Sequence, residues 1–122
     1  MTQPPIPFDP LEFLALARTL TDLGDNEANL RTAVGRAYYA VFLVARQRTG
    51  VSTASGTAHG DVVRALRARD RALADQLGRP RRLRNVADYE LVPVNAADRN
   101  WAKNWQEIDT IARHMLPRVL SI

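Results

Sequence analysis

The sequence predicts an all-α fold, an up-and-down antiparallel bundle of four main helices plus a short helix. Three observations predict it. Apolar residues recur at three- and four-residue spacing along five segments, as in helices that bury one face. Most of these segments begin or end at residues that commonly cap or stop helices. No segment alternates apolar and polar residues with many β-branched side chains, so we expect no strand.

The first helix is expected over residues 10–23. Asp9 is a capping residue placed directly before Pro10, and Gly24 follows the last apolar position. The second helix is expected over 27–49, between Asn26 as its cap and Gly50 as its stop. It has the most regular apolar stripe of the chain: Leu30, Ala33, Val34, Ala37, Val41, Val44 and Ala45.

Residues 50–57 are small and polar and are typical of a surface loop. A third helix is expected over 58–77, with Gly78 after it. Pro80 then begins a shorter helix over 80–91, whose inward positions are Leu83, Val86, Ala87 and Leu91.

The last helix is expected over 96–116, with Asn95 as its cap and Pro117 kinking or ending it. We assign residues 1–9 to an N-terminal lead and 10–122 to one helical-bundle domain, the size of an ordinary single domain. The apolar positions of the last helix are Trp101, Trp105, Ile108, Ile111, Ala112, Met115 and Leu116.

The composition excludes several classes of protein. There is no Cys, so disulfides and Cys-ligated metal sites are ruled out. The N-terminus has no basic start or apolar run, and no stretch approaches the roughly 18 apolar residues of a membrane span. We therefore expect a cytoplasmic bacterial protein that needs no membrane, and we expect no metal and no cofactor.

The charge of the chain is concentrated in one stretch. Sixteen Arg stand against one Lys, and eight of these Arg lie between Arg64 and Arg84 beside only two acids, Asp70 and Asp75. One interpretation is a basic face for phosphate, because guanidinium groups pair bidentately with phosphate oxygens. The other is a GC-rich genome, which favours Arg and Ala codons over Lys. The sequence leaves both open.

Three further features could support chemistry. Arg36 and Tyr39 lie on one face of an apolar and aromatic helix, where a buried guanidinium needs a carboxylate partner from another helix. His59 begins the third helix, where the positive end of the helix dipole favours its neutral form. Arg84 lies four residues before Asp88, and Arg81 lies one turn earlier.

Three motifs follow one another along the chain: RAYYAVF at 36–42, His-Gly at 59–60 and RLRNVADY at 82–89. In this order they resemble the HEPN domain, a family of small prokaryotic helical bundles, and the resemblance spans about residues 10–118. It implies a bundle of four main helices, commonly a homodimer, and often a minimal nucleotidyltransferase as gene neighbour. Many members are metal-independent ribonucleases of toxin–antitoxin or anti-phage systems. The motifs converge in the family's fold, so the resemblance also makes Asp88 the preferred carboxylate partner of Arg36.

The resemblance also implies an active site, an Arg followed after four to six residues by a His and doubled across the dimer. Arg84 matches the Arg, but Tyr89 stands in the His place. Neither His59 nor His114 has an Arg four to six residues before it. Tyr has an unperturbed pKa of about 10, so it is a poor base at pH 7.

Three hypotheses follow. In the first, the chain is a dimeric HEPN-like module that acts with a nucleotidyltransferase and binds nucleotide or RNA without efficient cleavage. In the second, it is a metal-independent endoribonuclease toxin with a variant active site of Arg84, Asp88 and Tyr89. In the third, it is a purely structural interaction protein. The binding residues of the first hypothesis are Arg36, Tyr39, His59, Arg81, Arg82 and Arg84.

Overall fold

The computed structural model describes residues 3–52 and 56–122. These ranges contain helices and no strand, so the all-α prediction is confirmed for them. The elements are α1 (Leu11–Leu23), α2 (Glu27–Thr49), α3 (Ala58–Arg69), α4 (Arg71–Gln76), α5 (Gly78–Tyr89), the 3-10 helix η1 (Ala96–Asp98) and α6 (Trp101–Leu120).

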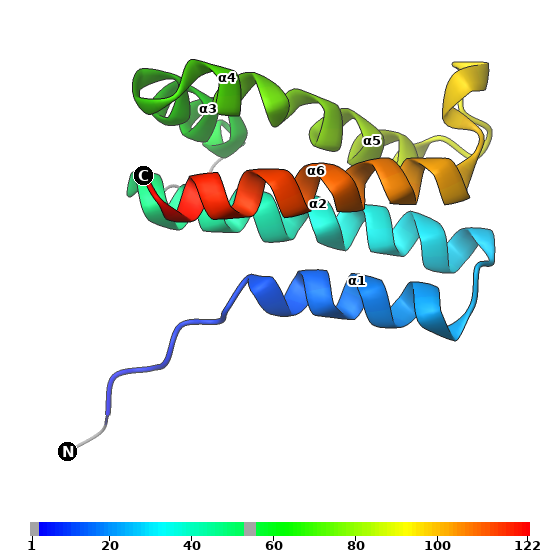
Figure 1. The fold of residues 1–122 in the computed structure, drawn as a ribbon, viewed down its shortest axis with the longest axis horizontal. Coiled ribbons are helices and arrows are strands. Elements are labelled where there is room, and N and C mark those ends of the chain that lie inside the picture. The colour runs from blue at the N-terminus through cyan, green and yellow to red at the C-terminus, as the bar shows by residue number, and fades with distance from the viewer. Residues whose placement is uncertain (1–2, 53–55) are drawn as a thin grey trace.

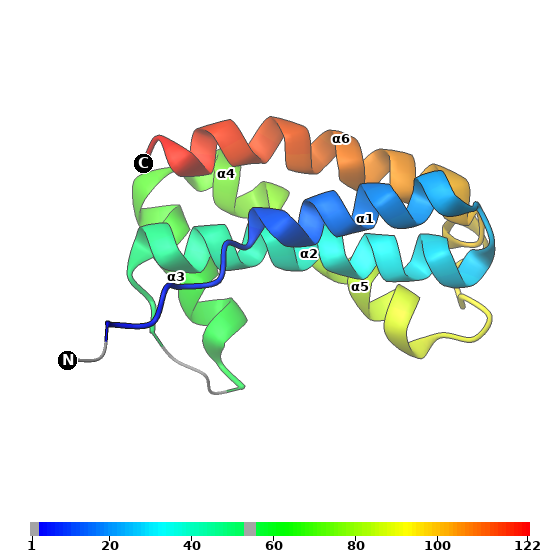
Figure 2. The same ribbon diagram turned by 90° about the horizontal axis from the view of Figure 1, so that it is seen from below.

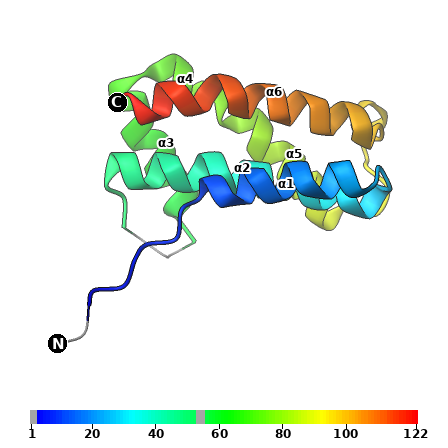
Figure 3. The same ribbon diagram turned by 60° about the horizontal axis from the view of Figure 1, so that its bottom comes forward.

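Helices α1, α2, α5 and α6 run lengthwise and alternate in direction along the chain (Figure 1). Helices α3 and α4 lie at the end of the bundle where α2 and α6 finish, and α3 crosses that end (Figure 2). The N-terminal lead extends away from the bundle (Figure 3). A helical bundle is therefore confirmed, while a HEPN-specific arrangement stays a prediction.

Helix α2 is the centre of the core, since it packs against α1, α3, α5 and α6. Apolar residues nearly encircle α2, and helices of the same chain cover them, so they do not by themselves require a second chain. The buried residues of α2 are Leu30, Ala33, Val34, Gly35, Ala37, Tyr38, Ala40, Val41, Phe42, Val44 and Ala45.

The bounds of α2 are those that its caps predict. Asn26 Oδ1 accepts a hydrogen bond from the Asn29 N–H at 2.9 Å. Gly50 takes a left-handed conformation with φ 74°, which Gly adopts at no steric cost, and its N–H donates to the Gln47 carbonyl. At α1, Asp9 Oδ1 accepts from the Leu11 N–H at 3.0 Å, as expected of a capping residue.

The prediction of a single helix over 58–77 is wrong, because the helix is interrupted at Asp70. This residue is extended, with φ −155°, and its carboxylate accepts from the Leu73 N–H at 3.0 Å. Arg118 of α6 donates to the same carboxylate at 2.8 Å. The Leu73 N–H first, and Arg118 as well, lower the pKa of Asp70. A cap and a distant cation together therefore end α3 and begin α4.

The expected start and end of the last helix are also wrong. Asn95 caps η1, and Asn100 caps α6 by accepting from the Lys103 N–H at 3.0 Å. Helix α6 continues through Pro117 to Leu120. Pro117 and Arg113, whose carbonyl loses its usual donor there, are both exposed, so water can replace the missing hydrogen bond.

Helix α5 begins and ends two residues earlier than expected. It ends at Tyr89, so Leu91 lies beyond it and is 93% exposed instead of buried. The guanidinium of Arg31 in α2 closes this end. Its Nη1 donates to the carbonyls of Ala87 at 3.2 Å and Glu90 at 2.7 Å, and its Nη2 donates to that of Leu91 at 3.0 Å. These bonds satisfy the carbonyls that a helix leaves free at its C-terminus.

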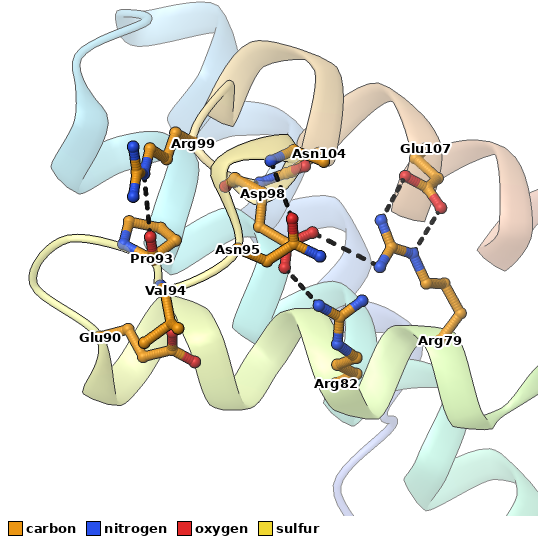
Figure 4. A network of polar contacts seen from close by, with 11 residues as sticks. Arg79, Arg82, Glu90, Pro93, Val94, Asn95, Asp98, Arg99, Asn104 and Glu107 are labelled. Atoms are coloured by element: carbon orange, nitrogen blue, oxygen red, sulfur yellow. Dashed lines mark hydrogen bonds and ion pairs between the residues drawn. The ribbon is translucent and has the colours of Figure 1, made fainter.

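A second polar network ties α5 to the chain before α6 (Figure 4). Asp98 is only 2% exposed, and its carboxylate lies 2.6 Å from Arg82 Nη2 and 3.6 Å from Arg79 Nη1. Asn104 donates to the Asp98 carbonyl at 2.7 Å. Arg79 also binds both carboxylate oxygens of Glu107, at 2.7 and 3.1 Å. Arg79 and Arg82 therefore connect α5 to Asp98 of η1, and Arg79 also connects it to Glu107 of α6.

Replacing Arg31 by Met should destabilise the protein by roughly 2–3 kcal/mol, because it leaves several carbonyls at the end of α5 without a donor. Urea unfolding followed by circular dichroism measures the change. Arg113→Met is the matched control, since the one side-chain partner of Arg113 among the described residues is Asp109, in an exposed helix-surface ion pair, and the change should cost less than about 0.5 kcal/mol. Equal unfolding midpoints for the two variants would contradict the role of Arg31.

Candidate functional site

Three of the sequence motifs meet where α2 packs against α3 and α5. Helix α2 contributes the adjacent Tyr38 and Tyr39, and α3 contributes His59. Helix α5 contributes Arg84, which bonds to Tyr39, and Arg81, whose charge acts on both Tyr38 and His59. We call these five residues the tyrosine–arginine site.

The inner part of the site is the pair of Tyr38 and His59. The Tyr38 hydroxyl lies 2.8 Å from His59 Nδ1, and the His59 ring stacks on Tyr38 and on Phe42. Burial raises the pKa of Tyr38 to about 12, against the opposing charges of Arg81 and Arg84. Burial, and then the charge of Arg81, lower the pKa of His59 to about 4.

These shifts decide what the pair can do at pH 7. His59 is neutral and Tyr38 keeps its proton, since both pKa values lie far from neutrality. An imidazole that is not protonated has no imidazolium proton to donate, and one with a pKa of about 4 is a weak base. The pair therefore offers hydrogen bonding and ring surface, and it is poorly suited to general acid–base catalysis.

The outer part of the site is built on Arg84. Its Nη2 donates to the Tyr39 hydroxyl at 2.7 Å, and its Nη1 donates to Asn85 Oδ1 at 3.0 Å. Its Nε lies 3.0 Å from Asp88 Oδ2, although the buried Nε–H is not aligned for a hydrogen bond. The guanidinium lies 5.2 Å from the ring centre of Tyr39 and 5.8 Å from that of Tyr89. Arg84 is thus held in place, with its charge offset by Asp88.

The expected ion pair between Arg36 and Asp88 is absent, because Asp88 pairs with Arg84 one turn away on its own helix. The Arg36 guanidinium instead lies 5.1 Å from the ring centre of Phe13 and 5.3 Å from that of Tyr39. Arg36 is only half-buried, so water can solvate its charge and no buried acid is required. It forms no ion pair or side-chain hydrogen bond with the residues that the structure describes.

The other candidates fall in different places. Arg82 points toward Asp98 (Figure 4) and donates to its carboxylate, so the structure does not gather it with the other binding residues. Asp88 and Tyr89 are exposed at the end of α5, beside Arg84. Tyr38 was not predicted as a site residue. Its only signal in the sequence is its place beside Tyr39, because its partner His59 is brought to it by the fold.

The Arg-rich stretch is not a continuous basic face. One of its eight Arg residues, Arg69, donates to the Arg48 carbonyl at 3.0 Å. Within the described ranges, only Arg71 and Arg81 of the eight have neither an acidic partner nor a side-chain hydrogen bond. The other five are in ion pairs: Arg64–Asp61, Arg67–Asp75, Arg79–Glu107, Arg82–Asp98 and Arg84–Asp88.

Among the described residues, no three His, Cys, Asp or Glu side chains are grouped so that they could hold a metal ion. None of the described helices combines the length and the apolar character needed to cross a membrane. Comparison of the chain with protein-family models, with curated proteins and with solved structures finds no match. The resemblance to the HEPN domain therefore rests on the three sequence motifs.

The low pKa of His59 predicts sensitivity to acid. Because this pKa falls from 6.5 to about 4 on folding, the unfolded chain takes up a proton between these pH values and the folded chain does not. The contribution of His59 to the free energy of unfolding should therefore decrease as the pH drops from 6.5 to about 4. In urea unfolding at a series of pH values, the free energy of unfolding of His59→Gln should depend less on pH than that of wild type. A His59 ring that titrates near pH 6.5 by NMR would contradict this account.

Proposed function

We propose that the chain is a module that binds nucleotide or RNA at the tyrosine–arginine site and does not cut the strand efficiently. The observation that carries the proposal is Arg81. This side chain is exposed and has no acidic partner among the described residues, its charge acts on Tyr38 and His59, and it lies one turn before Arg84. An unpaired guanidinium in such a place is suited to a phosphate.

The charges around Arg81 support an anionic ligand. Arg36 is a second guanidinium that has no acidic partner in the part of the chain that the structure describes, and it lies over the ring of Tyr39. The charge of Arg84 is offset by Asp88, and His59 is neutral at pH 7. Two positive charges are therefore in excess, and they attract phosphate groups over a distance of about 10 Å at ordinary ionic strength.

The same residues argue against efficient cleavage. His59 and Tyr38 have pKa values far from 7, and Tyr89 occupies the place where the resemblance implies a His. The second candidate function is a metal-independent endoribonuclease that uses Arg84, Asp88 and Tyr89. It is favoured by one observation, the exposure of Asp88 and Tyr89 beside the fixed guanidinium of Arg84.

The biological setting is proposed from the resemblance alone. It consists of a toxin–antitoxin or defence system in the bacterial cytoplasm, with a minimal nucleotidyltransferase as partner. Co-purification of the chain with the product of its neighbouring gene tests this setting. A neighbour unrelated to nucleotidyltransferases would contradict it.

Single-stranded RNA should bind with an affinity that falls steeply with salt, since phosphate contacts release counterions. Arg81→Ala and Arg84→Ala should each weaken binding roughly tenfold and make the log–log salt slope shallower by about 0.7. Arg71→Ala is the matched control, because Arg71 is equally exposed but lies at the start of α4. Fluorescence anisotropy of a labelled oligonucleotide measures all four proteins.

Incubation of the wild-type protein with RNA in EDTA for hours should leave the strand intact. A ladder of fragments that disappears in Arg84→Ala or Tyr89→Phe would favour the second candidate function, the endoribonuclease. If Arg81→Ala, Arg84→Ala and wild type all bind RNA equally weakly and none cuts it, both nucleic-acid functions fail. The third hypothesis, a structural interaction protein, would then remain.

We also propose a homodimer. The support is the family resemblance alone. Light scattering at micromolar concentration should give the mass of two chains. The mass of one chain, 13.6 kDa, would contradict the dimer.

A further inference from the structure

We infer that the site takes a single-stranded segment and that Tyr89 is the ring on which one unpaired base stacks. Arg84 holds a phosphate next to this base, and Arg81 holds a phosphate farther along the strand. The inference rests on the proposed function and adds the form of the ligand and the role of one residue.

The other rings of the site are already in use. Tyr38 is 4% exposed and stacks on Phe42, with their ring centres 5.7 Å apart. The ring of Tyr39 is contacted by two guanidinium groups, from Arg36 at 5.3 Å and Arg84 at 5.2 Å. A base that enters the site therefore has little ring surface available on α2.

Tyr89 differs from both. Its side chain is 74% exposed, and its ring contact with the described residues is the guanidinium of Arg84 at 5.8 Å. A cation beside an exposed ring supplies both things that single-strand binding uses, a charge for the backbone and a flat surface for the base. From Arg81 to Tyr89 the helix rises about 12 Å, which is room for a few nucleotides.

The backbone that carries Tyr89 is held rigidly. Arg31 donates to the carbonyls of Ala87 and Glu90, one on each side of this residue, and to that of Leu91. Glu90 in turn accepts from the Val94 N–H at 2.9 Å. An exposed ring on an ordered backbone costs little entropy when a ligand orders it further.

This geometry selects an unpaired base. In a duplex the faces of each base are covered by neighbouring base pairs, whereas bases of single strands can splay out onto protein rings. The phosphates of a duplex remain available to Arg81 and Arg84. Tyr89 should therefore matter for single strands alone, and the Arg residues should matter for both forms.

The test is fluorescence anisotropy with a labelled ten-nucleotide RNA, alone and annealed to its complement. Tyr89→Ala should weaken single-strand binding roughly 5- to 100-fold, the range for losing one stacked base, and should leave duplex binding unchanged. Tyr89→Phe keeps the ring and should bind within about twofold of wild type. Leu91→Ser is the control for general loss of apolar surface, because Leu91 is 93% exposed in the same segment, and it too should bind like wild type.

Four outcomes separate the ideas. If Arg81→Ala and Arg84→Ala weaken binding but Tyr89→Ala does not, the stacking role is overturned and the proposed function stands. If none of the three weakens binding, the proposed function itself fails. Equal losses for Tyr89→Ala and Leu91→Ser would indicate an apolar surface that docks another protein. If Tyr89→Ala lowered the affinity for single-stranded RNA and for the duplex equally, the role of the unpaired base would also be overturned.

A series with abasic sites in the oligonucleotide makes the test independent of the variant's fold. Wild type should lose affinity when the stacked base is removed, and Tyr89→Ala should lose nothing further on the abasic strand. Additive losses from the two changes would overturn the pairing of base and ring. Thermal unfolding checks that Tyr89→Ala, an exposed position, keeps the wild-type midpoint.

Discussion

The enclosure of α2 by four other helices is the constraint on which the structure depends. A helix covered on most of its sides must place its polar groups where they find partners, and α2 does so at two points along α5. Arg31 fills the C-terminal end of α5, and Tyr39 accepts from Arg84. The contact that builds the core therefore also places the side chains of the candidate site and orders the backbone of Tyr89.

Most of the positive charge serves the fold. Arg79 and Arg82 neutralise the buried Asp98, and Arg118 holds the break at Asp70. A count of Arg residues consequently overstates the attraction for phosphate. At the tyrosine–arginine site the guanidinium groups of Arg36 and the partly neutralised Arg84 both lie over the ring of Tyr39, and the unpaired Arg81 lies one turn before Arg84.

Local signals were predictable from the sequence and long-range partners were not. Asn26 and Gly50 define α2 through residues within one turn, and the prediction of this helix is confirmed. The break at Asp70 involves Arg118, 48 residues away, which no pattern near Asp70 reveals. The same holds for His59, since its low pKa comes from burial against α2 and from Arg81. The convergence of the three motifs was expected only through the family resemblance.

The central claim is that the tyrosine–arginine site binds a nucleic-acid strand. NMR of the protein labelled with 15N tests it most directly, because each Arg Nε–H reports its own surroundings during titration with RNA. The account predicts shifts at Arg81 and Arg84 and at the backbone of Tyr89, with Arg71 and Arg79 unchanged. Shifts that gather at Arg71 or elsewhere, with Arg81 and Arg84 unmoved, would contradict it.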